Sequence, residues 1–416
     1  MTTPRPHVAL VAPHFLENTN RYLRAFARLP GVTLSVISED AAGAVPRDLH
    51  DRVLHTQVRS TSDADQLVVA LGKLRAAAGP VDRLTGVLEQ LQMALAHARA
   101  GADIPGMRPE IARRFRDKDR MKEVLRARGV PVAASQLVRS LAELHAFVHE
   151  VGFPIIVKPR AGVGSRATHR VESAHDLAAL EQLGLVPTAS QPLQAEQFIR
   201  AREHTCETVS IHGKAVWRSG TRYFPTPLEV LETPWVQYCV LLPREIESPF
   251  TDFAPINGAA LAALFGDEPR VTGTALTHME WFLGDGGKLY VNEVGARPPG
   301  VQIMPLMSLA HDVDMIERLA ELIAFDRFTP PTRRWAAGAA FFRGQGAGDR
   351  VVLVRGVEEA RAKVGDALVE LRPPRVGQTR ASGYEGEGVA LVKHATTEGA
   401  MQALRALIET VQVRYG

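Results

Sequence analysis

Two glutamates on either side of a short glycine turn are the residues best suited to bind a divalent cation. Glu280 lies in THMEWF and Glu293 in YVNEVGARPPG, and the glycines at 284–287 predict a tight turn between two strands. Two carboxylates across a hairpin repel each other unless a cation lies between them, and Mg²⁺ prefers oxygen ligands. The same spacing is also compatible with two solvated surface glutamates.

A glycine-rich stretch that follows a strand offers a second group of candidate ligands. The apolar strand 154–158 ends at Lys158 and runs into Pro-Arg-Ala-Gly-Val-Gly-Ser, where Gly162, Gly164 and Ser165 would let backbone N–H groups approach an anion closely. Lys158 would then be a positive charge beside a phosphate. The lysine precedes the glycines, so this is not a Walker A loop, and a plain hairpin turn is the competing explanation.

Two further segments carry side chains that would suit parts of a nucleotide. Arg297 follows Glu293 by four residues in a proline-stiffened segment, and its forked guanidinium would suit a phosphate or a carboxylate. The segment 195–199, followed by Glu203, combines an acid, backbone groups and apolar side chains that would suit an adenine edge and ribose hydroxyls. An ordinary loop arginine and a plain half-buried strand are the alternatives.

These segments lie far apart in the chain, so several folded units must bring them together. Alternating strands and helices in the first 80 residues predict an N-terminal parallel α/β unit, and the absence of GxGxxG after its first strand argues against a dinucleotide site. An amphipathic helix is expected at 113–132, ended by a glycine and a proline. Further on, the patterns predict strand pairs at 195–217 and 277–300, a helix at 310–323, and a separate C-terminal α+β module from Trp335.

Composition indicates a globular protein with a small-molecule partner. The 416 residues are 45% hydrophobic, and 49 basic and 46 acidic residues are spread along the chain without a basic run, which argues against nucleic acid or membrane as partner. The first apolar run ends at Pro13, far short of the roughly 20 apolar residues of a membrane span, so a cytoplasmic protein is expected. Cys206 and Cys239 lack the spacing of a zinc site.

Taken in order, the motifs RDKDRMKEVLRARGVPV, IIVKPRAGVGS, EQFIRARE, HMEWF and NEVGARPPG resemble the ATP-grasp superfamily, which includes biotin carboxylase, D-alanine–D-alanine ligase and the bacterial L-amino-acid ligases. The resemblance covers residues 113 to about 325 and implies a multidomain protein of α/β and α+β units. Its expected parts are an N-terminal α/β domain (1–112), the small (113–190) and large (191–334) α+β lobes of an ATP-grasp fold, and a C-terminal α+β module (335–416).

The resemblance also implies a role for each motif residue. Lys118 and Lys158, two of only eight lysines, would contact ATP phosphates, and Gly162, Gly164 and Ser165 would belong to the loop that closes over them. Glu196, Gln197, Phe198 and Ile199 would form the hinge that reads adenine, and Glu203 would bind the ribose. Glu280 and Glu293 would hold Mg²⁺, with Mn²⁺ as an alternative, and Arg297 would stabilise the acyl phosphate. His278 would face phosphate or be a structural histidine.

Two positions depart from the pattern of the superfamily. Gly295 stands where many members carry an asparagine ligand of the metal, and Ala201 stands where the hinge often has glycine. The first departure leaves the third protein ligand of the metal without a candidate.

The resemblance implies an ATP-dependent carboxylate-amine ligase that forms an amide or peptide bond through an acyl phosphate and acts on small-molecule carboxylates and amines; a homodimer is compatible with it. Arg218 and Arg222 are candidates to hold a substrate carboxylate, and Glu229 or Glu232 an ammonium group. The alternatives are a ligase or carboxylase that acts on another biosynthetic intermediate, and a catalytically silent nucleotide-binding protein.

Overall fold

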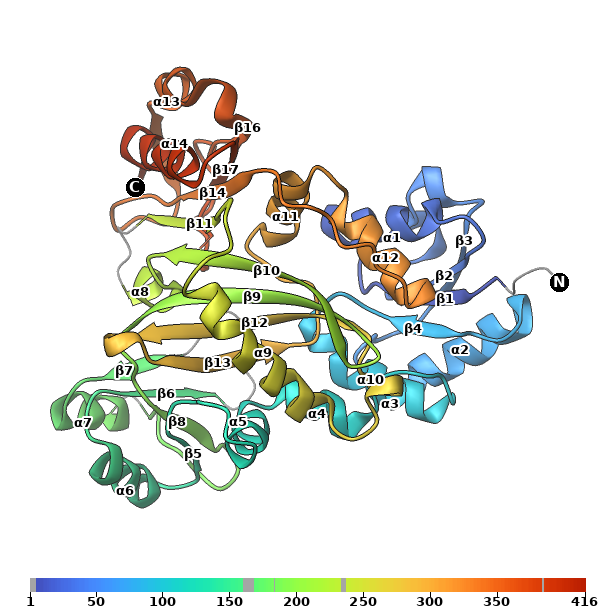
Figure 1. Ribbon diagram of the computed structural model, residues 1–416, viewed down its shortest axis with the longest axis horizontal. Helices are drawn as coiled ribbons and strands as arrows, with labels where there is room; N and C mark the ends of the chain where they lie inside the picture. The colour runs from blue at the N-terminus through green and yellow to red at the C-terminus, as the bar shows by residue number, and fades with distance from the viewer. Residues whose placement is uncertain (1–4, 160–167, 183, 233–236, 384) are drawn as a thin grey trace.

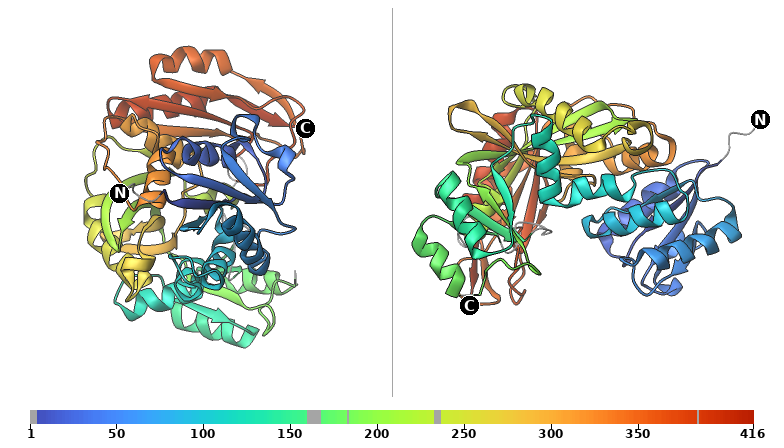
Figure 2. Two further views of the ribbon diagram at one scale, coloured as in Figure 1. Left: turned by 90° about the vertical axis from the view of Figure 1, so that its right-hand side faces the viewer. Right: turned by 90° about the horizontal axis from the view of Figure 1, so that it is seen from below.

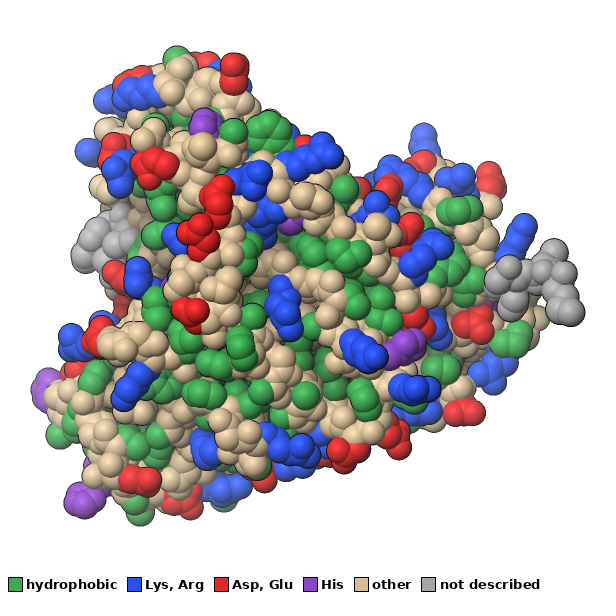
Figure 3. Space-filling model, in the orientation of Figure 1, with side chains coloured by type: hydrophobic (Ala, Val, Ile, Leu, Met, Phe, Trp, Pro, Cys, Tyr) green, Lys and Arg blue, Asp and Glu red, His purple; other side chains and the backbone are tan. Residues whose placement is uncertain are grey.

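The computed structural model describes residues 5–159, 168–182, 184–232, 237–383 and 385–416. A large sheet lies in the middle of the molecule, with the N-terminal unit at one end, a small lobe below it and the C-terminal residues above it (Figure 1). On the face drawn in Figure 3, basic and acidic side chains are interspersed, in keeping with the net charge of +3. Among the described residues, no helix combines the length and apolar character needed to cross a membrane.

The N-terminal unit is the expected parallel α/β structure. Its sheet has the order β3-β2-β1-β4 and is built from β1 (His7–Val11), β2 (Thr33–Ser38), β3 (Val53–Gln57) and β4 (Arg83–Thr85). Alternate residues of β1 enter different cores: Val8 and Leu10 pack with α1 (Glu17–Arg28), while Ala9 and Val11 pack with α2 (Ala64–Ala78) and α3 (Gln92–Gly101). Because both faces are covered, the strand reads as a continuous apolar run.

The large sheet is antiparallel and has the order β13-β12-β9-β10-β11-β14-β17-β16. Both predicted hairpins are present: one turns at 212–213 and the other at 284–287. The strands are β9 (Ala201–Ile211), β10 (Lys214–Phe224), β11 (Tyr238–Leu242), β12 (Ala275–Gly284), β13 (Leu289–Gly295), β14 (Ala336–Phe342), β16 (Leu368–Arg372) and β17 (Gly388–His394).

The C-terminal α+β residues continue this sheet rather than forming one apart from it. β14 pairs with β11, while β15 (Val351–Arg355) and β18 (Gln412–Tyr415) make a small sheet of their own beside α13 (Val357–Val364) and α14 (Thr397–Thr410). The side chain of Arg343 reaches back from the end of β14 and donates to the Val230 carbonyl in α8 (Pro227–Glu232) at 2.6 Å. This contact joins the C-terminal residues to the helix.

The small lobe is a four-stranded antiparallel sheet of order β5-β8-β6-β7 covered by two helices. Its elements are β5 (Ser135–Val138), α6 (Leu141–Val151), β6 (Ile155–Pro159), β7 (His169–Val171), α7 (Ala174–Gln182) and β8 (Leu193–Gln197). Figure 2 shows the chain passing into this lobe from the N-terminal unit through two short helices, α4 (Pro109–Arg116) and α5 (Lys118–Ala127).

Two expected helices prove to be interrupted. The single helix predicted over 113–132 is wrong, because Asp117 adopts an extended backbone (φ −100°, ψ 110°) between α4 and α5 and its side chain accepts from the Arg120 N–H. The helix predicted at 310–323 is likewise α11 (Ile303–His311) and α12 (Met315–Phe325), separated at Asp312 in the left-handed region. The sequence analysis did not predict the helices α3, α8, α9 (Phe250–Phe265) and α10 (Pro269–Thr272).

The fold class expected from the sequence, a parallel α/β unit followed by α+β parts, is confirmed. The domain ranges 1–112, 113–190, 191–334 and 335–416 stay predictions.

Candidate active site

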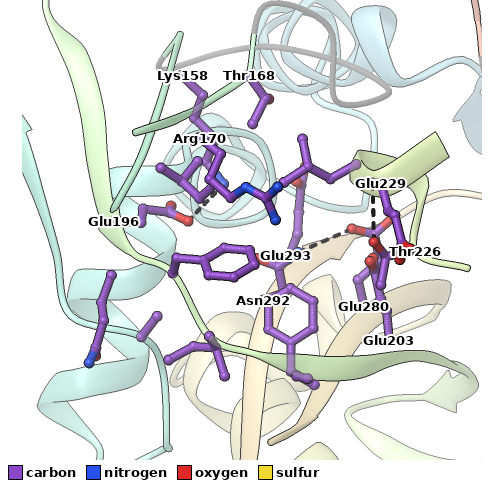
Figure 4. Close-up of a pocket in the computed structure, with 18 of the residues that line it drawn as sticks. Lys158, Thr168, Arg170, Glu196, Glu203, Thr226, Glu229, Glu280, Asn292 and Glu293 are labelled. Carbon is purple, nitrogen blue, oxygen red and sulfur yellow. Dashed lines mark hydrogen bonds and ion pairs between the residues drawn. The ribbon is translucent and has the colours of Figure 1, made fainter. Parts of the chain in front are cut away.

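One cavity lies between the small lobe and the large sheet (Figure 4). Its lining includes the nucleotide and metal residues predicted from the described parts of the chain: Lys118, Lys158, Glu196, Gln197, Phe198, Ile199, Glu203, Glu280 and Glu293. Gly162, Gly164 and Ser165 lie outside the described residues. Segments up to 175 positions apart, such as Lys118 and Glu293, are therefore in direct contact here.

The pairing of β6 with β8 puts Lys158 and Glu196 on one face of the small lobe. Ile156 is opposite Glu196 and Lys158 is opposite Gln194, so these alternate side chains point to the cavity side. The intervening Val157 packs into the core under α6 and α7. The positions of Lys158 and Glu196 thus follow from strand alternation.

Glu196 binds two ammonium groups. Its oxygens lie 2.8 Å from Lys158 Nζ and 2.8 Å from Lys122 Nζ, and its side chain is only 5% exposed. Burial alone would raise the pKa of Glu196, but the two lysines outweigh it and lower the pKa to about 2. Burial lowers the pKa of Lys122 to about 8, opposed by Glu196. For Lys158, burial is outweighed by the surrounding carboxylates, Glu196 first, and the pKa is raised.

Sequence reasoning missed Lys122. It follows Lys118 by four residues, one turn further along α5, so the two lysines share a helix face. That spacing was available as a signal in a chain with so few lysines.

Glu280 and Glu293 are directly opposite each other on β12 and β13. Lys118 stands at the first position of α5, and its Nζ lies 2.7 Å from a Glu293 oxygen. Burial would raise the pKa of Glu293, but Lys118 and Lys158 lower it. Among the described residues no cation lies at contact distance from nearby Glu203, and burial followed by repulsion from Glu280 raises its pKa well above the usual range.

The pair of glutamates fits a divalent cation by its donor chemistry. Both are carboxylates that face one cavity, with side chains 28% (Glu280) and 26% (Glu293) exposed, so oxygen atoms remain accessible. Within the described ranges, no cluster of three or more His, Cys, Asp or Glu side chains is arranged to hold a metal ion. A cation at Glu280 and Glu293 would therefore need further oxygens from elsewhere.

His278 lies behind Glu280 and Glu293 rather than in the cavity lining. Its Nδ1 is 2.9 Å from Glu207 on the neighbouring strand, and its Nε2 is 3.7 Å from Glu280. Burial would lower the pKa of His278, but the hydrogen bond to Glu207 and then that to Glu280 outweigh it and raise the pKa to about 9. The imidazolium is held between two carboxylates.

Arg297 is adjacent to the cavity but does not line it. Its Nη2 and Nε lie 2.7 and 2.9 Å from Glu89 in the short helix η3 (Glu89–Leu91) of the N-terminal unit. Burial would lower the pKa of Arg297, but Glu89 and more distantly Glu280 and Glu293 raise it. The sequence did not indicate Glu89, because nothing in its local pattern connects it to a residue 208 positions away.

Of the four residues predicted from the sequence to hold a substrate, two line this cavity and two do not. Glu229 and Glu232 line the cavity, together with Thr226 and Arg170, whose guanidinium stacks over the Phe198 ring. Two arginines lie elsewhere: Arg218 donates to the buried Asn257 side chain, and Arg222 stacks over Phe250. Both arginines alternate toward the α9 side of the sheet, which is why they do not reach this cavity.

Comparison with known protein families finds one match in this region. The family model described as "Carbamoyl-phosphate synthase L chain, ATP binding domain" matches residues 117–207. An L-arginine-specific L-amino acid ligase from Bacillus subtilis is 24% identical over 243 residues, which is 58% of this chain and 57% of that protein. The chain thus spans little more than half the length of this curated relative.

Two solved structures are similar over nearly the whole chain. The L-amino acid ligase from Bacillus licheniformis has a TM-score of 0.75 at 19% identity and covers 100% of both chains. The biotin carboxylase domain dimer of 2-oxoglutarate carboxylase from Hydrogenobacter thermophilus, in complex with MgADP and bicarbonate, has a TM-score of 0.65 at 16% identity and covers 98% of this chain and 90% of that one. At these identities the similarity establishes the fold.

Proposed function

We propose that this chain is an ATP-grasp enzyme, an ATP-dependent ligase that joins a carboxylate to an amine through an acyl phosphate. The observation that carries the proposal is the set of charges around one cavity: two opposed carboxylates, Glu280 and Glu293, close to the ammonium groups of Lys118 and Lys158. A protein that only held a nucleotide would not need acids and bases arranged together in this way.

In the proposed complex, the base of ATP lies against the hinge residues 196–199 and its ribose near Glu203. The phosphates then extend toward Lys118 and Lys158, whose ammonium groups would offset the negative charge of the phosphates. A divalent cation on Glu280 and Glu293, Mg²⁺ in the first instance, would screen the charge of the transferring phosphoryl group. Lys118 now neutralises Glu293 and would turn toward phosphate when the cation takes its place.

The first chemical step forms the acyl phosphate. A substrate carboxylate oxygen attacks the γ-phosphorus of ATP, the bond from that phosphorus to the β,γ-bridging oxygen breaks, and ADP leaves with the electron pair. The amine nitrogen then attacks the acyl carbon, inorganic phosphate leaves, and the nitrogen loses a proton to give the amide. The two lysines act by position and charge, which is the main contribution that phosphoryl transfer asks of a protein.

Arg297 is proposed to stabilise the oxyanion of the second step. Its ion pair with Glu89 fixes the guanidinium at the junction of the N-terminal unit and the large sheet, and its charge acts on the region of Glu280 and Glu293. The substrates would then enter between these two parts of the molecule. Glu229 lines the same cavity and would accept an ammonium group, whereas Glu232 already pairs with Arg170 at 3.2 Å.

A screen for ADP formation tests the function. Pairs of carboxylates and amines are incubated with the full chain, ATP and Mg²⁺, and the product is identified by mass spectrometry. ADP release that needs both substrates supports the ligase, whereas release that needs bicarbonate would indicate a carboxylase. ATP binding without phosphate release in any mixture would indicate a silent nucleotide-binding protein.

Glu293→Gln is the first variant to measure. The amide removes one of the two metal carboxylates and the partner of Lys118, so we expect ADP formation to fall by at least about 100-fold. Glu409→Gln, at an exposed position on α14, is the matched control and should retain the parent rate. ADP formation by Glu293→Gln at the parent rate would refute the assignment.

A further inference from the structure

β13 contains one more residue than its partner at the metal glutamates. Glu280 pairs with Glu293, but the next residue of β12, Trp281, pairs with Val291, so Asn292 has no partner and forms a β-bulge. Bulges change the direction of side chains next to functional sites. The extra residue therefore stands beside the two glutamates proposed to hold the cation.

The bulge turns two successive side chains toward the same cavity. In a regular strand neighbouring side chains point to opposite faces. Here Val291 and Val294 pack into the core with α5 and α9, while the two residues between them, Asn292 and Glu293, both line the cavity. Without the bulge, one of these polar side chains would point into the core.

The contacts of Asn292 leave its carbonyl oxygen available. Its Nδ2 lies 3.4 Å from Glu280 Oε2, and a carboxylate accepts but does not donate, so the nitrogen end of the amide must face Glu280. The described residues offer no hydrogen bond to Oδ1. Figure 4 shows Asn292 near Glu293 and Glu280 among the residues that line the cavity. An amide oxygen is a ligand that Mg²⁺ and Mn²⁺ accept.

Position 295 cannot provide this oxygen. Gly295 has no side chain to offer an oxygen; a Cβ at this position would lie in ordinary contact with Arg297, 3.4 Å from its Cγ and 3.6 Å from its Nε. The two glutamates alone leave the cation short of protein oxygens, while Asn292 is held next to both of them.

We propose that Asn292, turned into the cavity by the bulge, supplies the third protein oxygen to the divalent cation held by Glu280 and Glu293. This inference rests on the proposed function. It makes Asn292 a metal ligand, with its Nδ2 orienting Glu280 at the same time.

Binding of Mn²⁺ to the full chain in the presence of ADP, followed by electron paramagnetic resonance, tests the inference without an activity assay. Asn292→Ala removes the oxygen, and we expect its Kd for Mn²⁺ to rise on the order of 10-fold or more. Asn292→Asp keeps an oxygen at the same place and adds charge, so its Kd should equal or fall below that of the parent. Asn18→Ala, an exposed asparagine in α1, is the matched control.

Comparison of Asn292→Asp with Asn292→Ala distinguishes a metal ligand from a residue that only donates a hydrogen bond to Glu280. If Asn292 only donated to Glu280, Asn292→Asp would place two carboxylates in contact and weaken Mn²⁺ binding as much as alanine does, which would overturn the inference. Parent-like affinity in Asn292→Ala would overturn it as well. Should the alanine variant fail to fold, Asn292→Asp decides alone. If the parent chain itself does not bind Mn²⁺ with ADP, the proposed function also fails.

Discussion

Glu196 shows how a buried carboxylate can be fixed by neighbouring lysines alone. Its carboxylate is buried and lies between Lys122 of α5 and Lys158 of β6. A carboxylate at this depth would be costly without partners, and with two it remains ionised. The triad thereby sets the direction of Lys158 toward the cavity.

Lys122→Met tests this arrangement. The variant keeps the packing of the side-chain stem but leaves Glu196 to Lys158 alone, so Lys158 should be drawn more tightly to Glu196 and away from phosphate. We expect the free energy of unfolding to fall by about 1–3 kcal/mol and the Kd for ADP, measured by calorimetry, to rise several-fold. Lys73→Met, at an exposed position of α2, should change neither quantity. Unchanged ADP binding in Lys122→Met would contradict this role.

Candidate site residues could be predicted from the sequence where the charge of a side chain, its spacing and a flanking strand all indicated the same kind of site. Lys118, Lys158, Glu280 and Glu293 meet that condition, and the structure brings them to one cavity. Their roles toward ATP and metal stay predictions. The sequence did not indicate that Asn292 lines the cavity. Regular strand alternation would place its side chain on the face opposite Glu293, and only the bulge turns it to the same side.

At the scale of elements, the interruption between α4 and α5 decides where Lys118 stands. Asp117 ends one helix and caps the next, so Lys118 occupies a first turn, where the helix dipole is unfavourable to a cation and Glu293 compensates. A continuous helix, as the amphipathic pattern predicted, would turn this side chain in another direction. Local pattern alone did not reveal the cap because Asp117 lies inside a charged run.

Replacing the cap should affect stability and binding together. Asp117→Ala removes the hydrogen bond to the Arg120 N–H, and we expect about 1 kcal/mol less stability to urea and weaker ADP binding because Lys118 loses its fixed direction. Ser140→Ala removes the equivalent cap of α6, which accepts from the Glu143 N–H. It should cost similar stability without changing ADP affinity. Equal ADP affinity in both variants would show that the cap does not position Lys118.

At the scale of the whole molecule, buried neutral histidines make the fold sensitive to acid. His204 stacks on Trp281 at a centroid distance of 4.5 Å, and burial lowers its pKa to about 4. The unfolded chain therefore binds this proton at pH values where the folded chain does not. The contribution of neutral His204 to stability is complete above pH 6.5 and is lost as pH falls toward 4.

Comparison with His204→Phe isolates this effect. Because phenylalanine does not titrate, the stability of the parent should fall relative to the variant by about 1.4 kcal/mol per pH unit between pH 6.5 and 4. Urea unfolding at several pH values measures the difference. His149→Phe, at an exposed position on α6, is measured alongside as the surface control. A pH-independent difference for His204→Phe would contradict the assignment.

The overall architecture was largely predictable, because apolar periodicity and glycine turns indicated the parallel unit and both hairpins of the large sheet. The position of the N-terminal unit next to the cavity could not be predicted. The ion pair of Glu89 with Arg297 depends on the packing of two units, and neither residue has a local signal for its partner. The continuity of β14 with β11 depends on the same kind of long-range pairing.

That continuity bears on any attempt to trim the protein to its nucleotide-binding part. A fragment that stopped before Trp335 would lose the hydrogen-bonding partner of β11 and leave an open, apolar strand edge of the kind that drives chains to aggregate. It would also lose the Arg343 anchor of α8, whose residues Leu228, Glu229 and Glu232 form one wall of the cavity. The residues after Trp335 thus support one wall of this cavity, and a fragment that keeps the cavity intact must include them.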